Sequence, residues 1–237
     1  MSEMELSIRL EAIAACVKPG LAIADIGTDH GYLPIELIRR SISPKALACD
    51  VRRGPLERAQ QHIKEADLAE QVETRLSNGF EMILPGEVNG CVIAGMGGML
   101  VRDILEAESK REKNILKEMQ QLILQPQSDM EAVRRMVHML SFQIVDESML
   151  VDRDKHYWIL VCEPGVEGYE KQWQYRYGRC LTERRDPVLH MYLQHKYNKN
   201  AELLENLERN VSEAALQRCQ QLLEEQRELA EVLDLWN

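Results

Sequence analysis

The feature that most constrains the fold is a loop with two glycines near the N-terminus, Asp25-Ile-Gly-Thr-Asp-His-Gly-Tyr-Leu-Pro34. An apolar stretch, Leu21 to Ala24, precedes this loop, and a helical pattern over 35–39 follows it. A strand, a tight glycine turn and a helix form the unit in which a nucleotide-like ligand lies over the carboxyl end of a parallel sheet. Gly27 and Gly31 let the backbone turn sharply and approach such a ligand. The loop therefore predicts an α/β fold with a ligand site at this edge.

The residues between the two glycines indicate the charge of the ligand. Asp29 and His30 stand where a dinucleotide-binding loop keeps small, uncharged residues. A carboxylate at this position would repel a pyrophosphate, whereas it suits a ligand with a cationic group nearby. S-adenosylmethionine carries such groups, an ammonium and a sulfonium. The loop thus favours methyl transfer over hydride transfer.

Strand and helix patterns alternate through the first two thirds of the chain. The expected strands cover 21–26, 46–49, 72–76, 90–94, 122–124, 142–150 and 157–162, and Ser128 to Glu131 has the form of a capping box that starts a helix. This alternation predicts a mostly parallel, doubly wound sheet, and the polar turn at 152–155 makes the last pair antiparallel. We expect a Rossmann-like class I methyltransferase sheet.

The character of the chain changes after Glu163-Pro-Gly165, because no strand pattern remains. Pro187 is suited to begin a long helix, leucines recur at helical spacing up to Trp236, and 210–212 is a reversal signal. We expect two domains, a methyltransferase domain at 1–163 and a helical, coiled-coil-like domain at 164–237. A short solvent-exposed bundle without a partner is the alternative for the second.

Composition describes an ordinary globular protein. Of the 237 residues, 45% are hydrophobic and 29% are charged, and no run of about 18 apolar residues predicts a membrane span. Six scattered cysteines without a CxxC pair indicate reduced thiols and give no support for zinc. We expect a cytoplasmic monomer without a metal.

The charge is uneven along the chain. A net charge of −10 argues against a general nucleic-acid coating protein, yet 171–199 holds seven Lys or Arg against two acids, with aromatic residues between them. Cations with aromatics suit RNA, although helix packing explains the aromatics nearly as well. The candidate RNA-binding residues are Lys171, Arg176, Arg179, Arg184, Arg185, Lys196 and Lys199.

Three residues after the second and third strands fit an adenosine. Asp50 stands about 23 residues beyond Gly27, where an acid hydrogen-bonds the two ribose hydroxyls. Asn78 and Gly79 can read the adenine edge. A solvated turn acid and a common Asn-Gly turn are the plainer explanations.

The fourth strand leads into Gly95-Met96-Gly97-Gly98, at the edge where a methyl acceptor usually enters. The Asn/Asp-Pro-Pro-aromatic motif of enzymes that methylate exocyclic amines is absent. A ring nitrogen such as adenine N1 has its own lone pair, so it needs orientation for in-line transfer more than it needs a base. A packing turn is the alternative.

The remaining candidates surround this edge. Arg9 could pair with the cofactor carboxylate or be a surface charge, and Asp29 could hold the ammonium or cap the turn. His30 or Tyr32 could lie near the acceptor base. The candidate cofactor-binding residues are Arg9, Asp25, Gly27, Asp29, His30, Gly31, Asp50, Asn78, Gly79, Gly95, Gln125 and Pro126, and the candidate catalytic residues are Asp29, His30, Tyr32, Gly95, Met96, Gly97 and Gly98.

Together these motifs, with Leu6 to Leu10 and Lys155-His-Tyr157, resemble the bacterial tRNA (adenine(22)-N(1))-methyltransferase family over residues 5 to about 163. The resemblance implies S-adenosylmethionine as cofactor, N1 of adenine 22 in the D-arm region of tRNA as acceptor, and tRNA contact by the helical domain. The alternatives are a methyltransferase acting on a small molecule or protein, and a non-catalytic RNA-binding scaffold.

Overall fold

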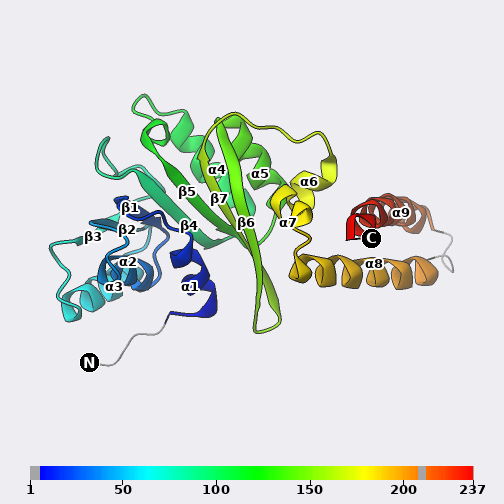
Figure 1. Ribbon diagram of the computed structural model, residues 1–237, viewed down its shortest axis with the longest axis horizontal. Helices are drawn as coiled ribbons and strands as arrows, with labels where there is room; N and C mark the ends of the chain where they lie inside the picture. Colours follow the sequence, from blue (N-terminus) through cyan, green and yellow to red (C-terminus); the bar gives the residue numbers. More distant parts are fainter. Residues whose placement is uncertain (1–5, 208–211, 237) are drawn as a thin grey trace. The chain divides into compact units, whose positions relative to one another are not determined.

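The computed structural model describes residues 6–207 and 212–236, and it divides into two compact units, Met1–Gly168 and Tyr169–Asn237 (Figure 1). The first unit holds the seven-stranded sheet and the second is helical.

The sheet has the strand order β3-β2-β1-β4-β5-β7-β6. Its strands are β1 Ile23–Ile26, β2 Ala46–Asp50, β3 Val72–Leu76, β4 Gly90–Met96, β5 Gln121–Pro126, β6 Phe142–Asp152 and β7 Lys155–Pro164. The first five strands are parallel, and β7 runs antiparallel to both of its neighbours. The predicted fold class, a Rossmann-like methyltransferase sheet with an antiparallel last strand, is confirmed.

The helices of the first unit are α1 Ile8–Ala15, α2 Tyr32–Arg39, α3 Arg53–Glu65, α4 Gly98–Ser109, the short η1 Ile115–Glu118 and α5 Met130–Met139. Strands β1, β2 and β5 are buried along their whole length, which explains why they read as continuous apolar runs. Helices α1 and α2 pack on β1 and β4 in one cluster, and α2 and α3 pack on β2 and β3 in another.

The strand order reverses at β1, which pairs with β2 on one side and with β4 on the other. A ligand crevice forms outside the carboxyl ends of the strands at such a switch point. The loops that follow β1, β2, β3 and β4 all lie at this edge (Figure 1).

The predicted capping box at Ser128 is wrong. Helix α5 begins at Met130, its N-cap Asp129 has a φ of 52°, and no side chain caps it. Ser128 instead accepts a hydrogen bond from the Gly98 N–H (3.2 Å) and donates one to Asp129 (2.7 Å). The serine therefore ties the start of α4 to the loop before α5.

The second unit contains α6 Gln172–Tyr177, α7 Arg179–Glu183, α8 Pro187–Leu207, α9 Glu213–Leu233 and η2 Asp234–Trp236. Pro187 begins α8 as predicted, and α8 packs against α9. Ser212 caps α9 by accepting a hydrogen bond from the Ala215 N–H at 3.3 Å. The rest of the expected reversal, 210–211, lies outside the described residues.

Candidate functional site

A cavity of about 510 Å³ opens at the carboxyl edge of the sheet. The sequence-predicted residues that line it come from α1 and from the ends of β1 to β4: Arg9, Gly27, Asp29, Asp50, Asn78, Gly79, Gly95 and Met96. A smaller cavity of about 70 Å³ shares Arg9, Gly27 and Asp29 and adds Asp25 and Tyr32. The fold thus brings ten of the predicted residues to one site.

The loop after β1 is hydrogen-bonded to β2. The N–H groups of Gly27 and Thr28 both donate to the Cys49 carbonyl, each at 2.8 Å. Gly27 has a φ of 78°, and a Cβ there would lie 2.0 Å from Met96 Cε. The positive φ favours glycine at this position, whereas the nearby atom is the flexible end of the Met96 side chain.

Asp50 is held in place at the end of β2. Its side chain is 5% exposed, and one carboxylate oxygen accepts a hydrogen bond from the Arg52 N–H at 2.7 Å. A buried carboxylate that faces a cavity provides a fixed acceptor for hydroxyl groups of a ligand.

Asp25 lies beneath the loop in the small cavity. Burial raises the pKa of its carboxyl group to about 6, and the nearby charge of Arg9 works in the opposite direction. Ionising the Asp25 carboxyl group therefore costs more free energy than ionising a solvated one.

Gln125 supports the site from behind. It is fully buried, and its side-chain oxygen accepts hydrogen bonds from Arg9 (2.8 Å) and from the Gly95 N–H (3.1 Å). The Arg9 guanidinium also lies over the Tyr157 ring, 5.9 Å from its centroid. Gln125 thus fixes two residues of the cavity wall without lining the cavity itself.

Several predicted residues lie away from both cavities, namely His30, Gly31, Gly97, Gly98, Gln125 and Pro126. The His30 ring stacks with Tyr32 and with His62 of α3, at centroid distances of 5.3 and 5.8 Å. The His30 carbonyl is also hydrogen-bonded to His62 Nδ1 at 2.9 Å. His62 joins α3 to the loop after β1, and no motif in the sequence indicated this role.

Sequence reasoning also missed part of the cavity lining, which includes Val51, Ser77, Leu100, Ile104 and Gln127. Val51 and Ser77 directly follow β2 and β3, so their position at the strand ends could have identified them as cavity residues. Leu100 and Ile104 are four residues apart on α4 and therefore share one helix face.

The predicted RNA-binding cations are largely engaged within the helical unit. Lys171 pairs with Glu231, Arg176 with Glu228, Arg179 with Glu183 and Lys196 with Glu225, at 2.5–3.2 Å. Arg184, Arg185 and Lys199 are exposed. The acids of α9 therefore offset much of the positive charge that the sequence segment carries.

In the described part of the chain, no helix has the length and apolar character that a membrane crossing needs. The same residues contain no group of three or more His, Cys, Asp or Glu side chains that could hold a metal ion.

The fold and the site define an S-adenosylmethionine-dependent class I methyltransferase, and residues 6–160 match the methyltransferase domain family. The chain is 34% identical to the tRNA (adenine(22)-N(1))-methyltransferase of Bacillus subtilis (strain 168) over 165 residues, which are 70% of this chain and 68% of that protein. It belongs to the tRNA (adenine(22)-N(1))-methyltransferase family.

Solved structures agree with this assignment. The B. subtilis m1A22 tRNA methyltransferase TrmK is 27% identical, with a TM-score of 0.86 and coverage of 98% of this chain and 100% of that one. The Streptococcus pneumoniae protein Sp1610, solved in complex with S-adenosyl-L-methionine, is 33% identical, with a TM-score of 0.85 and coverage of 97% of this chain and 100% of that one.

Proposed function

We propose that the protein transfers a methyl group from S-adenosylmethionine to N1 of adenine 22 in tRNA. The observation that carries the proposal is the cavity in which Asp50, Asn78 and the Gly95-Met96 backbone come together beside the Gly27 turn. The family relationship supplies the acceptor, because the relatives are m1A22 tRNA methyltransferases.

The cavity suits the cofactor. S-adenosylmethionine supplies an electrophilic methyl group on its sulfonium when it is bound. Buried Asp50 would accept hydrogen bonds from the ribose hydroxyls, and Asn78 with Gly79 would meet the adenine. Arg9 would pair with the carboxylate, and Asp29 would face the ammonium.

The last residues of β4 would orient the acceptor. The Gly95 N–H is held by Gln125 and its φ is 78°, so the backbone turns away from the strand at the mouth of the cavity. Adenine N1 carries a lone pair, so the chain has to position the base and needs no strong proton acceptor before transfer. Extruding the base costs a few kcal/mol, which stacking and pocket contacts would offset.

Contact with tRNA would come in part from the helical unit, through Arg184, Arg185 and Lys199, which are exposed. The proposal takes the enzyme to be a cytoplasmic monomer that works without a metal ion. Cys49, Cys91 and Cys162 are buried in the sheet, which suits thiols that stay reduced.

The proposal is tested with S-adenosylmethionine labelled at the methyl carbon and two tRNA transcripts that differ only in having adenine or guanine at position 22. We expect label in the adenine 22 transcript only. Equal labelling of both transcripts, or label in neither, would rule out adenine 22 as the acceptor.

A further inference from the structure

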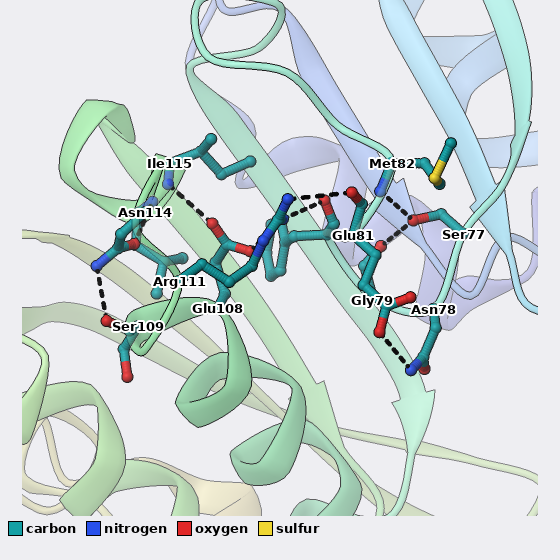
Figure 2. A network of polar contacts seen from close by, with 12 residues as sticks. Ser77, Asn78, Gly79, Glu81, Met82, Glu108, Ser109, Arg111, Asn114 and Ile115 are labelled. Atoms are coloured by element: carbon teal, nitrogen blue, oxygen red, sulfur yellow. Dashed lines mark hydrogen bonds and ion pairs between the residues drawn. The ribbon is translucent and has the colours of Figure 1, made fainter.

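A polar network outside the cofactor cavity clamps the loop that carries Asn78 and Gly79 (Figure 2). Strand β3 ends at Leu76, and directly after it the Ser77 N–H donates to the Asp50 carbonyl of β2 at 2.9 Å. Within the loop, Ser77 Oγ donates to the Gly79 carbonyl at 2.8 Å and accepts from the Met82 N–H at 3.1 Å. The two Ser77 Oγ contacts shape the turn, and the Ser77 N–H holds its start beside β2.

A second anchor lies beyond the turn, at Arg111 in the segment after α4. Its guanidinium donates to the carbonyls of Phe80 (2.9 Å) and Glu81 (3.1 Å), the residues that directly follow Gly79. A guanidinium presents several donors in a fixed planar fork, so one side chain can hold two successive carbonyls. Arg111 therefore holds the far end of the Asn78-Gly79 turn, together with the buried Phe80 side chain.

Glu108, on the last turn of α4, fixes Arg111 in turn. Its carboxylate is 2% exposed, and one oxygen accepts from Arg111 Nη1 at 2.8 Å. The other oxygen accepts from the Ile115 N–H at 2.8 Å, so the carboxylate is held on both sides (Figure 2). Charge-assisted hydrogen bonds of this kind are among the stronger polar contacts in proteins.

The clamp lies next to the cofactor cavity without belonging to it. Neither Glu108 nor Arg111 lines the 510 Å³ cavity, whereas Asn78, Gly79, Leu100 and Ile104 do. On its other side the Asn78-Gly79 turn meets α4 directly, because a Cβ at Gly79 would lie 2.9 Å from Ile104 Cγ2. The turn thus contacts α4, and Asn78 and Gly79 line a second cavity of about 470 Å³ together with Glu108 and Arg111.

We propose that Arg111 and Glu108 are positioning residues for the adenine-binding edge of the cofactor site, with Glu108 acting through Arg111. The inference rests on the cofactor role proposed above for Asn78 and Gly79. It gives the segment after α4 a role in selecting the cofactor. The sequence alone does not indicate this role, because the segment is far from β3 along the chain.

The test measures binding of S-adenosylhomocysteine by calorimetry to the full chain, and kinetics with tRNA. For Arg111→Gln we expect the dissociation constant to rise about tenfold, because the charge-assisted hydrogen bonds that place the turn are removed. The kcat at saturating cofactor and the KM for tRNA should stay within about twofold of the wild-type values. Arg102→Gln is the matched control, since Arg102 is on α4 but bonds to its neighbour Asp103.

Two further comparisons distinguish positioning from a general loss of folding. Arg111→Gln should bind S-inosylhomocysteine, which lacks the adenine amine, nearly as well as S-adenosylhomocysteine, whereas the wild type should prefer the latter. Glu108→Gln still accepts from the Ile115 N–H, so it should fold and show a smaller effect, and the double variant should match Arg111→Gln alone.

The inference is overturned if Arg111→Gln binds S-adenosylhomocysteine within twofold of the wild type, or if it weakens both ligands equally. Additive effects of the two substitutions would contradict the action of Glu108 through Arg111. A wild-type protein that binds no S-adenosylhomocysteine would instead refute the cofactor site itself, and the inference with it.

Discussion

The cavity proposed to bind the cofactor is lined by residues at the carboxyl ends of strands. Asp50, Asn78 and Gly95 were predictable because each lies at or just after the end of an expected strand, and parallel strands bring their carboxyl ends to one edge. Gln125, another predicted cofactor-binding residue, is fully buried and accepts hydrogen bonds from Arg9 and from the Gly95 N–H. The Arg9–Gln125 bond joins residues more than 100 positions apart, so no local pattern reveals it.

Asp50→Asn should weaken cofactor binding about tenfold, because the amide keeps the turn contact to the Arg52 N–H but removes a charged acceptor. Calorimetry with S-adenosylmethionine measures the effect. Glu57→Gln, on the exposed side of α3, is the control and should bind as the wild type does. Affinity of the Asp50 variant within twofold of wild type would remove the ribose role from this residue.

The buried Asp25 predicts a specific pH dependence of stability. Its pKa is raised to about 6 from an ordinary value near 4, so the folded state binds a proton that the unfolded state has already lost between these pH values. The free energy of unfolding of the wild type, relative to Asp25→Asn, should therefore fall as the pH rises from about 4 to about 6 and then level off. Urea denaturation of both proteins at several pH values measures this difference. A difference that does not change with pH would contradict the buried, proton-binding carboxyl group.

At the scale of elements, the mostly parallel sheet with its antiparallel last strand was predictable, because strand and helix patterns alternate along the chain. The start of α5 was not. Ser128 and Glu131 have the spacing of a capping box, but Ser128 bonds to the Gly98 N–H across the edge of the sheet. A tertiary hydrogen bond here replaces the local one that the sequence suggests.

The start of α4 depends on the absence of a side chain at Gly98. A Cβ at this position would lie 2.1 Å from the Ser128 carbonyl oxygen, whereas a Cβ at Gly97 would lie 3.5 Å from Ser128 Oγ. Gly98→Ala should therefore lower the free energy of unfolding by about 1–3 kcal/mol through overpacking. Gly97→Ala is the matched control and should change it by no more than about 0.5 kcal/mol. Chemical denaturation of the two variants measures these free energies of unfolding. Equal values for Gly98→Ala and Gly97→Ala would contradict the prediction, because they would show that the loop before α5 moves aside without cost.

At the scale of the whole molecule, the helices of the second unit were predictable from the sequence, but the surface charge of this unit was not. Seven Lys or Arg residues lie between 171 and 199, yet Lys171, Arg176 and Lys196 pair with acids of α9. These acids are distant in sequence, so a count along the segment overstates the positive surface.

This difference among the cations can be tested in binding to tRNA. Arg185→Gln/Lys199→Gln should weaken binding and lower the slope of log K against log salt by about 1 for each phosphate that the protein no longer neutralises. Lys171→Gln/Arg176→Gln removes the same charge, but Glu231 and Glu228 already offset these two cations, so its effect should be smaller. The measurement is a salt titration of tRNA affinity. Equal reductions of affinity in the two double variants would contradict the distinction.

The most direct test of the central claim is mass spectrometry of nuclease fragments from an unmodified tRNA transcript incubated with the protein and S-adenosylmethionine. The account predicts 1-methyladenosine at position 22, formed by the wild type and reduced in Asp50→Asn at low cofactor concentration. A tRNA that remains unmethylated, or a methyl group on any other atom or position, would contradict it.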